Sequence, residues 1–403
     1  MKKIKIGIIR ETKIPPERRT PLTPKNCLTL MKKFPEIEIV VQPSKIRIVL
    51  DEEYKANKIP LQEDLDDCDY LFGLKEIPPG DMIENKTYFI FSHTIKKQPE
   101  NKRMLKAMAQ KHISLIDYEC IKNKKGERTI SFGHFAGMVG AYNAIKTYGH
   151  KWHLFVMKPA HQCINLKEFK AWQRRISLPP LKIILTGGGR VAGGAAKVLD
   201  YMHITEVSPN DFIKNKYDKP VYCRLHSADY YHKQNHHIFD KSEFYTSPAA
   251  YVSHFMNYAV HADMLISCHY WNPGAPPLFT KQDAKSPDFH IKVIADITCD
   301  VNGSIPVTLR STSIDNPVYD YNPDTMDLEV PYNKPDNITV MAIDNLPCEL
   351  ARDASEDFGL QLIKHLIPEL YKKNKSKLLS QATILNSGVL TDRYAYLNDY
   401  INM

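Results

Sequence analysis

The sequence has no long apolar segment. None of its apolar runs approaches the ~18–20 residues that a membrane-spanning helix needs, so we expect no transmembrane segment and no membrane partner. An internal repeat of fixed period and a low-complexity tract are also absent, which excludes collagen, coiled coils and disordered chains. The 403 residues have ordinary globular composition, and at this length two or three domains are expected rather than one core.

Cysteine pairs and runs of positive charge are missing as well. The eight cysteines are scattered without a C-x-x-C motif, so we expect reduced thiols in a cytoplasmic protein rather than a zinc site or a disulfide scaffold. Lysine and arginine outnumber aspartate and glutamate by 54 to 46, but without a long basic run, so we expect no nucleic-acid partner. The densest histidine pair, His236-His237, lacks any H-E-x-x-H spacing, and we expect a solvated loop there and no metal.

The N-terminal segment MKKIKIGIIRETK has only a superficial likeness to a signal peptide. Its apolar stretch is too short and alternates with lysine, and an Arg-Glu-Thr-Lys run replaces a small-residue cleavage site. The segment therefore predicts the first strand of the fold.

Short apolar segments rich in β-branched residues alternate with helical patterns, and this alternation indicates an α/β fold with mostly parallel sheets. A first series of strands is predicted at Lys5–Ile9, Ile37–Val41, Tyr70–Leu74, Tyr88–Ser92 and Ile113–Tyr118. A second series is predicted at Leu181–Thr186, Ile204–Val207, Met264–Cys268 and Val293–Ile297. The natural architecture is two α/β domains with a cleft between them.

Two helices are predicted to connect and complete these domains. Phe132–Lys151 has small residues at close helical spacing, which suits a tightly packed helix that joins the domains. Asp353 or Ser355 is predicted to cap a final amphipathic helix, which we expect to pack on the first domain. The apolar face of that helix carries Phe358, Leu362, Ile363 and Leu366.

The strongest local signal for a ligand is the segment LKIILTGGGRVAGGAAKVL. A buried strand runs into Gly187-Gly188-Gly189, and a helix of small residues follows from Arg190 and Val191. Glycines let the backbone turn tightly and approach a pyrophosphate at a helix N-terminus, where free N–H groups and the helix dipole favour anions. The pattern predicts a dinucleotide site, and the alternative is a glycine-rich turn without a ligand.

The next predicted strand bears on which dinucleotide binds. A strand that holds the adenosine ribose of NAD should end in an acidic residue. Here Glu206 lies inside the strand and Ser208 lies nearer its end. Because a serine does not repel a 2′-phosphate, the sequence permits NAD(P)(H) with a slight preference for NADP(H).

Ionisable residues follow three predicted strands of the first series. Lys75-Glu76, His93 and Glu119 each come directly after a strand, with Lys96 one turn beyond His93. Since the carboxyl ends of parallel strands line the ligand crevice, these side chains could meet there as acid/base groups with perturbed pKa values. The alternative is that polar residues follow strands only because loops are polar.

Two further places could bind substrate. The strand Val293–Ile297 leads into a second acidic edge, with carboxylates at Asp296 and Asp300. Arg18-Arg19 precedes a predicted helix, and a guanidinium can clamp a substrate carboxylate through two parallel hydrogen bonds. A solvated surface pair of arginines is equally consistent with the sequence.

Seven motifs spread along the chain carry a family resemblance. They are RETKIPPERRTPLTP, FGLKEIPP, TYFIFSHTIKKQ, LIDYE, ISFGHFAG, ADITCDVNGSI and AIDNLPCELARDAS. With them the chain resembles the saccharopine dehydrogenase family, within the broader alanine dehydrogenase and transhydrogenase-like superfamily. The resemblance runs from residue 3 to the C-terminus. It is closest to the lysine–ketoglutarate reductase half of the bifunctional animal aminoadipic semialdehyde synthases.

This resemblance implies two Rossmann-like domains with the reaction in the cleft between them. Residues 1–132 plus 349–403 would form the substrate domain, and residues 133–348 the dinucleotide-binding domain. The implied reaction joins lysine and 2-oxoglutarate through an imine that a nicotinamide hydride reduces to saccharopine, or runs in reverse. An alanine dehydrogenase-like enzyme with another amine and keto acid is the alternative. A non-catalytic nucleotide-binding protein is the third hypothesis, and the presence of Lys75 and His93 argues against it.

The same resemblance assigns roles to individual residues. Lys75 and His93 match the acid/base pair, and Glu76 and Glu119 match carboxylates that tune their pKa values. Substrate contacts are implied for Arg19, Lys96, Arg128, Thr298, Cys299 and Asp300. Besides the glycine loop, cofactor contacts are implied for Arg190, Tyr270, Ile297, Ala342, Ile343, Asp344 and Asn345.

Some positions depart from the family pattern. The acidic ribose-binding residue of the NAD-using fungal enzymes has no evident counterpart, and the loop from Gly187 to Gly194 differs in detail. Glu76 follows the fungal pattern, whereas the animal reductase half carries a basic residue there. No glutamate-forming dehydrogenase half is present, so we expect the chain to act alone or to pass saccharopine to a separate protein. The resemblance leaves a monomer and a homodimer open.

Overall fold

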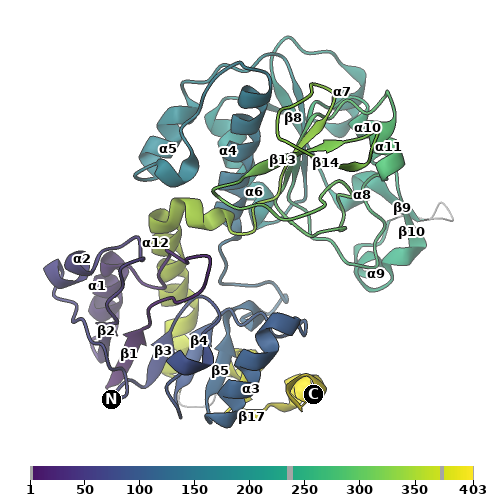
Figure 1. Cartoon of the computed structure of the whole chain (residues 1–403). Helices are drawn as coiled ribbons and strands as arrows, with labels where there is room; N and C mark the ends of the chain where they lie inside the picture. The colour runs from purple at the N-terminus through teal and green to yellow at the C-terminus, as the bar shows by residue number, and fades with distance from the viewer. Residues whose placement is uncertain (1–2, 234–238, 373–375, 403) are drawn as a thin grey trace. The chain divides into compact units, whose positions relative to one another are not determined.

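A computed structural model of the chain describes residues 3–233, 239–372 and 376–402. The chain forms two compact units (Figure 1): unit 1 comprises Met1–Phe132 and Ala351–Met403, and unit 2 comprises Gly133–Leu350. Each unit has its own sheet with helices packed on it, and most strand pairs are parallel, so the predicted α/β fold class is confirmed. Within the described ranges, no helix combines the length and the apolar composition that crossing a bilayer requires.

The described part of unit 1 contains a seven-stranded sheet in the order β17-β16-β5-β4-β3-β1-β2. Strands β1 to β5 pair in parallel, whereas β16 and β17 add antiparallel pairs at one edge. The strands are β1 (Ile4–Ile8), β2 (Ile37–Val41), β3 (Tyr70–Phe72), β4 (Thr87–Ile90), β5 (Ser114–Asp117), β16 (Thr383–Asn386) and β17 (Val389–Leu390). The N-terminal segment is thus a strand of the sheet, as predicted.

The helices of unit 1 begin where local chemistry favours them. At the start of α1, Thr23 accepts a hydrogen bond from the backbone N–H of Asn26 and donates its own backbone N–H to the Asn26 side chain, and Pro24 takes the first helical position. The helices of this unit are α1 (Pro24–Lys33), α2 (Asp51–Ala56), α3 (Lys102–Gln110), α12 (Ala351–Gln361), α13 (Ile367–Leu370), α14 (Lys377–Ala382) and α15 (Asn398–Asn402).

The final amphipathic helix starts earlier than predicted. Helix α12 follows directly on a 3₁₀ segment, Leu346–Leu350, so Asp353 and Ser355 lie inside the helix and the predicted cap is wrong. The hydroxyl of Ser355 instead accepts a hydrogen bond from the backbone N–H of Thr20 at 2.9 Å. The predicted apolar face is confirmed, because its four residues belong to the hydrophobic core of unit 1: Phe358, Leu362, Ile363 and Leu366.

The described part of unit 2 contains an eight-stranded sheet in the order β14-β13-β15-β12-β11-β6-β8-β7 and a separate two-stranded sheet. Its strands are β6 (Lys182–Thr186), β7 (Thr205–Val207), β8 (Val221–Leu225), β9 (Tyr231–Lys233), β10 (Tyr251–Ser253), β11 (Met264–Ser267), β12 (Val293–Asp296), β13 (Val318–Asn322), β14 (Asp327–Glu329) and β15 (Ile338–Met341). Its helices are α4 (Gly133–Lys151), α5 (Leu166–Gln173), α6 (Arg190–Tyr201), α7 (Pro209–Lys214), α8 (Ser227–Tyr230), α9 (Lys241–Thr246), α10 (Met256–Ala259) and α11 (Lys281–Lys285).

Helix α4 is packed as closely as its small residues predicted. A Cβ atom on Gly137 would lie 1.8 Å from the carbonyl oxygen of Val191 in α6. A Cβ atom on Gly194 of α6 would in turn lie 2.0 Å from the carbonyl oxygen of His134. The two helices therefore meet backbone to backbone, and only glycine fits at these two positions.

The strand order of unit 2 differs from the simplest expectation. The strand that follows α6 along the chain, β7, does not lie beside β6. Strand β8, which the sequence patterns did not predict, pairs with β6 on one side and with β7 on the other. The segment predicted to end near the cofactor ribose is therefore the outermost strand of this sheet.

Candidate active site

Three neighbouring strands of unit 1 bring ionisable residues to one edge of the sheet. Strands β3, β4 and β5 pair in parallel as adjacent strands. Lys75, His93 and Glu119 follow the ends of these strands by two or three residues. Since carboxyl ends of parallel strands meet at one edge, the structure brings together the ends from which the predicted acid/base groups extend.

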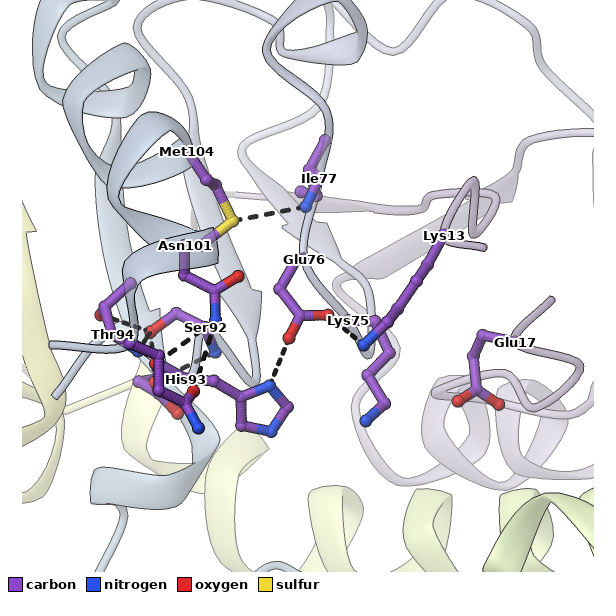
Figure 2. Close-up of polar contacts among 12 residues, drawn as sticks. Lys13, Glu17, Lys75, Glu76, Ile77, Ser92, His93, Thr94, Asn101 and Met104 are labelled. Carbon is purple, nitrogen blue, oxygen red and sulfur yellow. Dashed lines mark hydrogen bonds and ion pairs between the residues drawn. The ribbon is translucent and has the colours of Figure 1, made fainter. Parts of the chain in front are cut away.

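His93 is oriented by Glu76. Its Nδ1 lies 2.5 Å from Oε1 of Glu76, and the ammonium of Lys13 lies 3.0 Å from Oε2 of the same carboxylate (Figure 2). Burial alone would raise the pKa of Glu76, but the hydrogen bond and charge of His93 lower it to about 2. Because an ionised carboxylate only accepts hydrogen bonds, Nδ1 of His93 carries the proton, and Nε2 is left to exchange a proton with a substrate.

The backbone of His93 supports a special role. Its φ of 51° lies in the left-handed region, which residues with a side chain rarely adopt. Such conformations cluster at active sites, where the surrounding structure holds them. The imidazole is therefore presented by a backbone geometry that a regular strand end would not have.

Lys75 extends from the end of β3 to the side on which the His93 ring lies (Figure 2). Burial lowers the pKa of Lys75, and the positive charges of Arg19 and Lys13 lower it further, whereas Glu17 acts in the opposite direction. Among the described residues, no side chain accepts a hydrogen bond from its ammonium group. Lys75 is half-buried, and an ammonium with a lowered pKa gives up a proton more readily than an ordinary lysine, as an acid/base group requires.

Arg19 is held in a buried ion pair. Glu17 accepts hydrogen bonds from Nε of Arg19 at 2.8 Å and from Nη2 at 2.6 Å, and the guanidinium carbon lies 4.0 Å from the centroid of the Phe132 ring. Burial alone would raise the pKa of Glu17, but the charge of Arg19 lowers it to about 2. The role of Arg19 as a substrate clamp stays a prediction, and Glu17 sets the direction in which its guanidinium points.

The remaining predicted residues of unit 1 occupy the neighbouring strand end. Glu119 is buried and accepts a hydrogen bond from Nη2 of Arg128, whose backbone lies opposite Lys122 in an isolated antiparallel bridge. Lys96 is exposed. The structure thus joins Glu76 and His93 directly and places the Glu119–Arg128 pair beside them along the sheet.

Sequence reasoning missed Lys13 and Glu17. The signal was present in the charged run RETKIPPERR, which directly follows the first strand. Strand β1 pairs with β3, so residues after β1 arrive at the same edge as Lys75. The pattern of ionisable residues at strand ends indicated Lys75 and Glu76. It did not indicate Lys13 and Glu17, which lie in the loop after β1.

The glycine loop of unit 2 fits a dinucleotide. Gly187 has a φ of 95°, and a Cβ atom there would lie 2.9 Å from the carbonyl oxygen of Cys268. A Cβ atom on Gly188 would lie 2.7 Å from the ring of His226, whereas Gly189 faces open space. Side chains would therefore obstruct the turn, and the third glycine leaves room for an anion at the start of α6. This arrangement fits the pyrophosphate of NAD(P), with Arg190 and Val191 in the first turn.

Other predicted cofactor residues lie elsewhere in unit 2. Ser208 is exposed and caps α7, since its hydroxyl accepts from the backbone N–H of Asp211 at 3.1 Å and donates to the Asp211 carboxylate at 2.7 Å. It follows the edge strand β7, so β8 lies between Ser208 and the glycine loop. Tyr270 follows β11 and is 64% exposed. The side chain of Ile297 contacts α4 at Gly140, where a Cβ atom would lie 2.3 Å away.

The second acidic edge is largely internal. Asp296 is buried and accepts hydrogen bonds from the hydroxyls of Thr298 at 2.6 Å and Thr308 at 2.7 Å, and burial raises its pKa. Cys299 has a φ of 49°, and its Sγ lies 3.9 Å from the Asp344 carboxylate. Strand β12 leads into the predicted substrate residues Thr298, Cys299 and Asp300. The adjacent β15 leads into the predicted cofactor residues Ala342, Ile343, Asp344 and Asn345.

Clusters of metal-ligand side chains and paired cysteines do not occur among the described residues. No group of three or more His, Cys, Asp or Glu side chains that could hold a metal ion occurs in the part of the chain that the structure describes. The pair His236-His237 lies outside the described residues. All eight cysteines are free.

A family model matches most of the N-terminal part of unit 1. Residues 7–139 match the family model of the alanine dehydrogenase/PNT N-terminal domain. The matched range includes the end of β1 and strands β2 to β5, and with them Lys75, His93 and Glu119.

Longer alignments confirm the resemblance that the motifs indicated. The chain is 31% identical to an alpha-aminoadipic semialdehyde synthase of Arabidopsis thaliana, over 97% of this chain and 41% of that protein. It is 29% identical to the mitochondrial alpha-aminoadipic semialdehyde synthase of Rattus norvegicus, over 94% and 46%. It is 26% identical to a saccharopine dehydrogenase [NAD(+), L-lysine-forming] of Emericella nidulans, over 96% and 98%. The chain is a homologue of these proteins and spans less than half the length of the semialdehyde synthases.

Two solved structures share the fold along nearly the whole chain. An L-alanine dehydrogenase aligns with a TM-score of 0.65 at 15% identity and covers 99% of both chains. A transhydrogenase from Sinorhizobium meliloti aligns with a TM-score of 0.60 at 12% identity, over 96% of this chain and 98% of the other. At such identities the likeness shows the fold alone, and it confirms the Rossmann-like α/β architecture.

Proposed function

We propose that the protein is an NAD(P)-dependent oxidoreductase acting on a CH–NH bond, a saccharopine dehydrogenase of the L-lysine-forming type. It would interconvert saccharopine with lysine and 2-oxoglutarate. The observation that carries the proposal is the pairing of His93 with Glu76 at the strand ends of unit 1, beside a half-buried Lys75 whose pKa is lowered. The names of the homologues supply the substrate.

The proposal divides the work between the two units. Unit 1 would act on the substrate, and unit 2 would bind the nucleotide at the loop from Gly187 to Gly189. When bound there, the nicotinamide would supply or accept the hydride. The predicted domain boundaries and the predicted cleft between the domains are part of this proposal.

The acid/base steps follow from the geometry of unit 1. In the saccharopine-forming direction, Nε2 of His93 takes a proton from the lysine ε-ammonium, and the free amine adds to the keto carbon of 2-oxoglutarate. The ammonium of Lys75 then protonates the departing hydroxyl of the carbinolamine, so that water leaves and an imine forms. Addition of hydride to the imine carbon gives the secondary amine of saccharopine. From the lysine ε-ammonium to the neutral secondary amine, the sum consumes one NAD(P)H and releases one water, and the proton that His93 takes up equals the one that Lys75 gives.

Cations near these groups would hold the substrate carboxylates. Arg19 and Arg128 each carry a carboxylate partner, Glu17 and Glu119, which fixes where their guanidinium groups lie. Lys96 is exposed beyond the end of β4 and would serve as a mobile cation. Thr298, Cys299 and Asp300 would complete the substrate site from unit 2.

We propose that NADPH is accepted at least as well as NADH. Strand β8 lies next to β6, so its carboxyl end, at His226, takes the place where an acidic residue would hold the NAD ribose. The nearest carboxylate along the chain, Asp229, accepts a hydrogen bond from the backbone N–H of His226 at 2.6 Å. Glu206 is likewise engaged, since its carboxylate accepts a hydrogen bond from the hydroxyl of Tyr222 at 2.7 Å. Neither carboxylate is directed by these bonds toward a ribose.

A spectrophotometric assay tests the proposed reaction. Purified protein is mixed with lysine, 2-oxoglutarate and either NADH or NADPH, and absorbance is followed at about 340 nm, where reduced nicotinamide absorbs. Oxidation that requires both lysine and 2-oxoglutarate supports the proposal, and the ratio of rates gives the cofactor preference. Activity with pyruvate and ammonium alone would favour an alanine dehydrogenase-like enzyme.

A further inference from the structure

Two buried carboxylates bind backbone N–H groups at the edge of the unit 1 sheet where the acid/base residues lie. The first is Glu11, which is 8% exposed and follows β1. Its Oε1 accepts a hydrogen bond from the backbone N–H of Leu74 at 2.6 Å, and its Oε2 accepts one from the backbone N–H of Lys75 at 3.0 Å. One side chain thus ties the loop after β1 to the segment that carries Lys75.

The second is Asp117, the fully buried last residue of β5. Its Oδ2 accepts hydrogen bonds from the backbone N–H of Ser92 at 3.1 Å and from the Ser92 hydroxyl at 2.5 Å. Its Oδ1 accepts one from the backbone N–H of Glu119 at 2.7 Å. Asp117 therefore bonds the residue before His93 and the backbone of Glu119 at the same time.

We propose that Glu11 and Asp117 are positioning residues that fix the backbone of the acid/base groups. Glu11 acts on Lys75, and Asp117 acts on His93 and Glu119. Strands β3, β4 and β5 are only three or four residues long and end before these residues. A backbone hydrogen bond from Phe91 to Leu74 at 3.1 Å continues the pairing of β3 and β4 past their ends, but it leaves the N–H groups of Leu74, Lys75 and Ser92 to the two carboxylates. The carboxylates supply the acceptors there, and a displacement of about 1 Å of an acid/base group can cost about 100-fold in rate. This inference rests on the proposed acid/base roles.

The surroundings of the two carboxylates make them sensitive to substitution. Burial raises the pKa of Glu11 to about 7, and Glu17 contributes in the same direction, while the N–H donors of Leu74 and Lys75 and the charge of Arg19 oppose it. Tyr118 also faces Glu11. A protonated carboxyl would turn an O–H toward an N–H, so the bonds to Leu74 and Lys75 need the ionised form.

Asp117 has a similar environment. Burial raises its pKa to about 6, against the hydrogen bonds from Ser92 and from the backbone of Glu119, and the charge of Glu119 adds to the rise. Tyr118, Cys120 and Tyr394 also face it. Both positioning carboxylates therefore hold their N–H donors only on the alkaline side of these pKa values.

The test compares Glu11→Gln and Asp117→Asn with Asp69→Asn as a matched control. The Asp69 carboxylate accepts a hydrogen bond from the backbone N–H of Lys5 at 2.9 Å, at the opposite edge of the same sheet. We expect kcat to fall about 10- to 100-fold in the first two variants, with the acid limb of the kcat–pH profile shifted and NAD(P)H affinity within about twofold. Asp69→Asn should lower the melting temperature but keep kcat and its pH profile.

Amide hydrogen exchange on the same proteins gives a readout that needs no activity. Glu11→Gln should speed amide exchange at Leu74 and Lys75 and leave exchange at Ser92 unchanged. Asp117→Asn should speed exchange at Ser92 and leave exchange at Leu74 and Lys75 unchanged. Unchanged exchange in both variants would overturn the inference, and so would faster exchange with normal kcat and pH profile. If the variants show the expected exchange but the unaltered protein has no saccharopine activity, the proposed function is overturned. The backbone contacts of Glu11 and Asp117 are then still established. Should Glu11→Gln fail to fold, Glu11→Asp, which keeps the charge on a shorter side chain, replaces it and should slow kcat less.

Discussion

The two units present the same structural feature, the carboxyl edge of parallel strands, with opposite chemistry. In unit 1 that edge carries ionisable side chains around two carboxylates: Lys13 and His93 contact Glu76, and Arg19 contacts Glu17. In unit 2 the corresponding edge at β6 consists of glycines and the N-terminus of α6. The difference shows how one architecture serves two tasks, because proton transfer needs side chains with shifted pKa values, whereas an anion can be bound by the backbone alone.

Buried titratable groups near the glycine loop agree with this division. His269 follows β11 and is 5% exposed, and burial lowers its pKa to about 4, so the ring is neutral at physiological pH. The hydroxyl of Thr186, at the end of β6, lies 2.8 Å from its Nδ1. This histidine joins two strand ends as an uncharged group, unlike His93, which faces an ionised carboxylate.

Removing the ammonium of Lys75 should produce the largest effect. In Lys75→Met a side chain of similar length no longer transfers a proton, so we expect kcat to fall by about 10³-fold or more. Binding of NAD(P)H, measured by quenching of protein fluorescence, should stay within about twofold because the glycine loop is untouched. Turnover near that of the unaltered protein would remove Lys75 from the acid/base role.

Glu17→Gln should destabilise unit 1 in a pH-dependent way. The pKa of Glu17 is about 2 in the folded protein and about 4.3 in an unfolded chain, so its stabilisation is present above pH ~4.3 and is lost as the pH falls toward 2. Removing the carboxylate that Arg19 binds should lower the free energy of unfolding by about 3 kcal/mol near pH 7, since a buried charge pair is broken. Urea unfolding at a series of pH values should show the deficit shrink toward pH 2, and a pH-independent deficit would contradict this account.

Glu76→Gln tests the orientation of His93. The amide can still accept from Nδ1 of His93, but it does not stabilise the imidazolium that forms when Nε2 takes a proton. We expect kcat to fall by about 100-fold and the acid limb of its pH profile to move toward lower pH, because the imidazolium is less favoured without the carboxylate. A loss confined to KM would show that Glu76 serves binding instead.

Gly187→Ala should weaken nucleotide binding with little effect on the chemistry. The left-handed backbone and the carbonyl oxygen of Cys268, 2.9 Å from the new Cβ, cost about 1–2 kcal/mol, or about a tenfold rise in the Kd for NAD(P)H. Gly193→Ala is the matched control, because its Cβ would meet nothing within 4 Å inside α6. That control should raise stability by about 0.5–1 kcal/mol and leave the Kd unchanged. Equal effects of the two substitutions would rule out a role for the loop.

Much of this arrangement could be predicted from sequence, because it depends on local patterns. The parallel strands that carry Lys75, His93 and Gly187 are short apolar runs, and the structure has each of them within one or two residues at either end. Strands β13 and β16 were not predicted, since β13 buries Asp320 and Asn322 and β16 pairs antiparallel at an edge.

Contacts between distant segments were beyond prediction. The order β6-β8-β7 depends on pairing between segments that are separated along the chain, and nothing near Ser208 indicates that β8 would come between it and the glycine loop. Glu11 accepts a hydrogen bond from Lys75, which lies far along the chain, and Glu17 accepts one from Arg19, which is only two residues away. No spacing rule predicts either hydrogen bond. The positions of the charged groups were predictable, and the family resemblance indicated Glu76 as a partner of the acid/base pair, whereas Lys13, Glu11 and Glu17 were not indicated.

The most direct test of the division between the two edges measures kcat and the Kd for NAD(P)H in both Lys75→Met and Gly187→Ala. The account predicts opposite outcomes: Lys75→Met loses turnover by about 10³-fold and keeps nucleotide affinity, and Gly187→Ala loses affinity about tenfold and keeps turnover at saturating cofactor. If both substitutions reduced the two constants together, the separation of proton transfer and anion binding between the units would be contradicted.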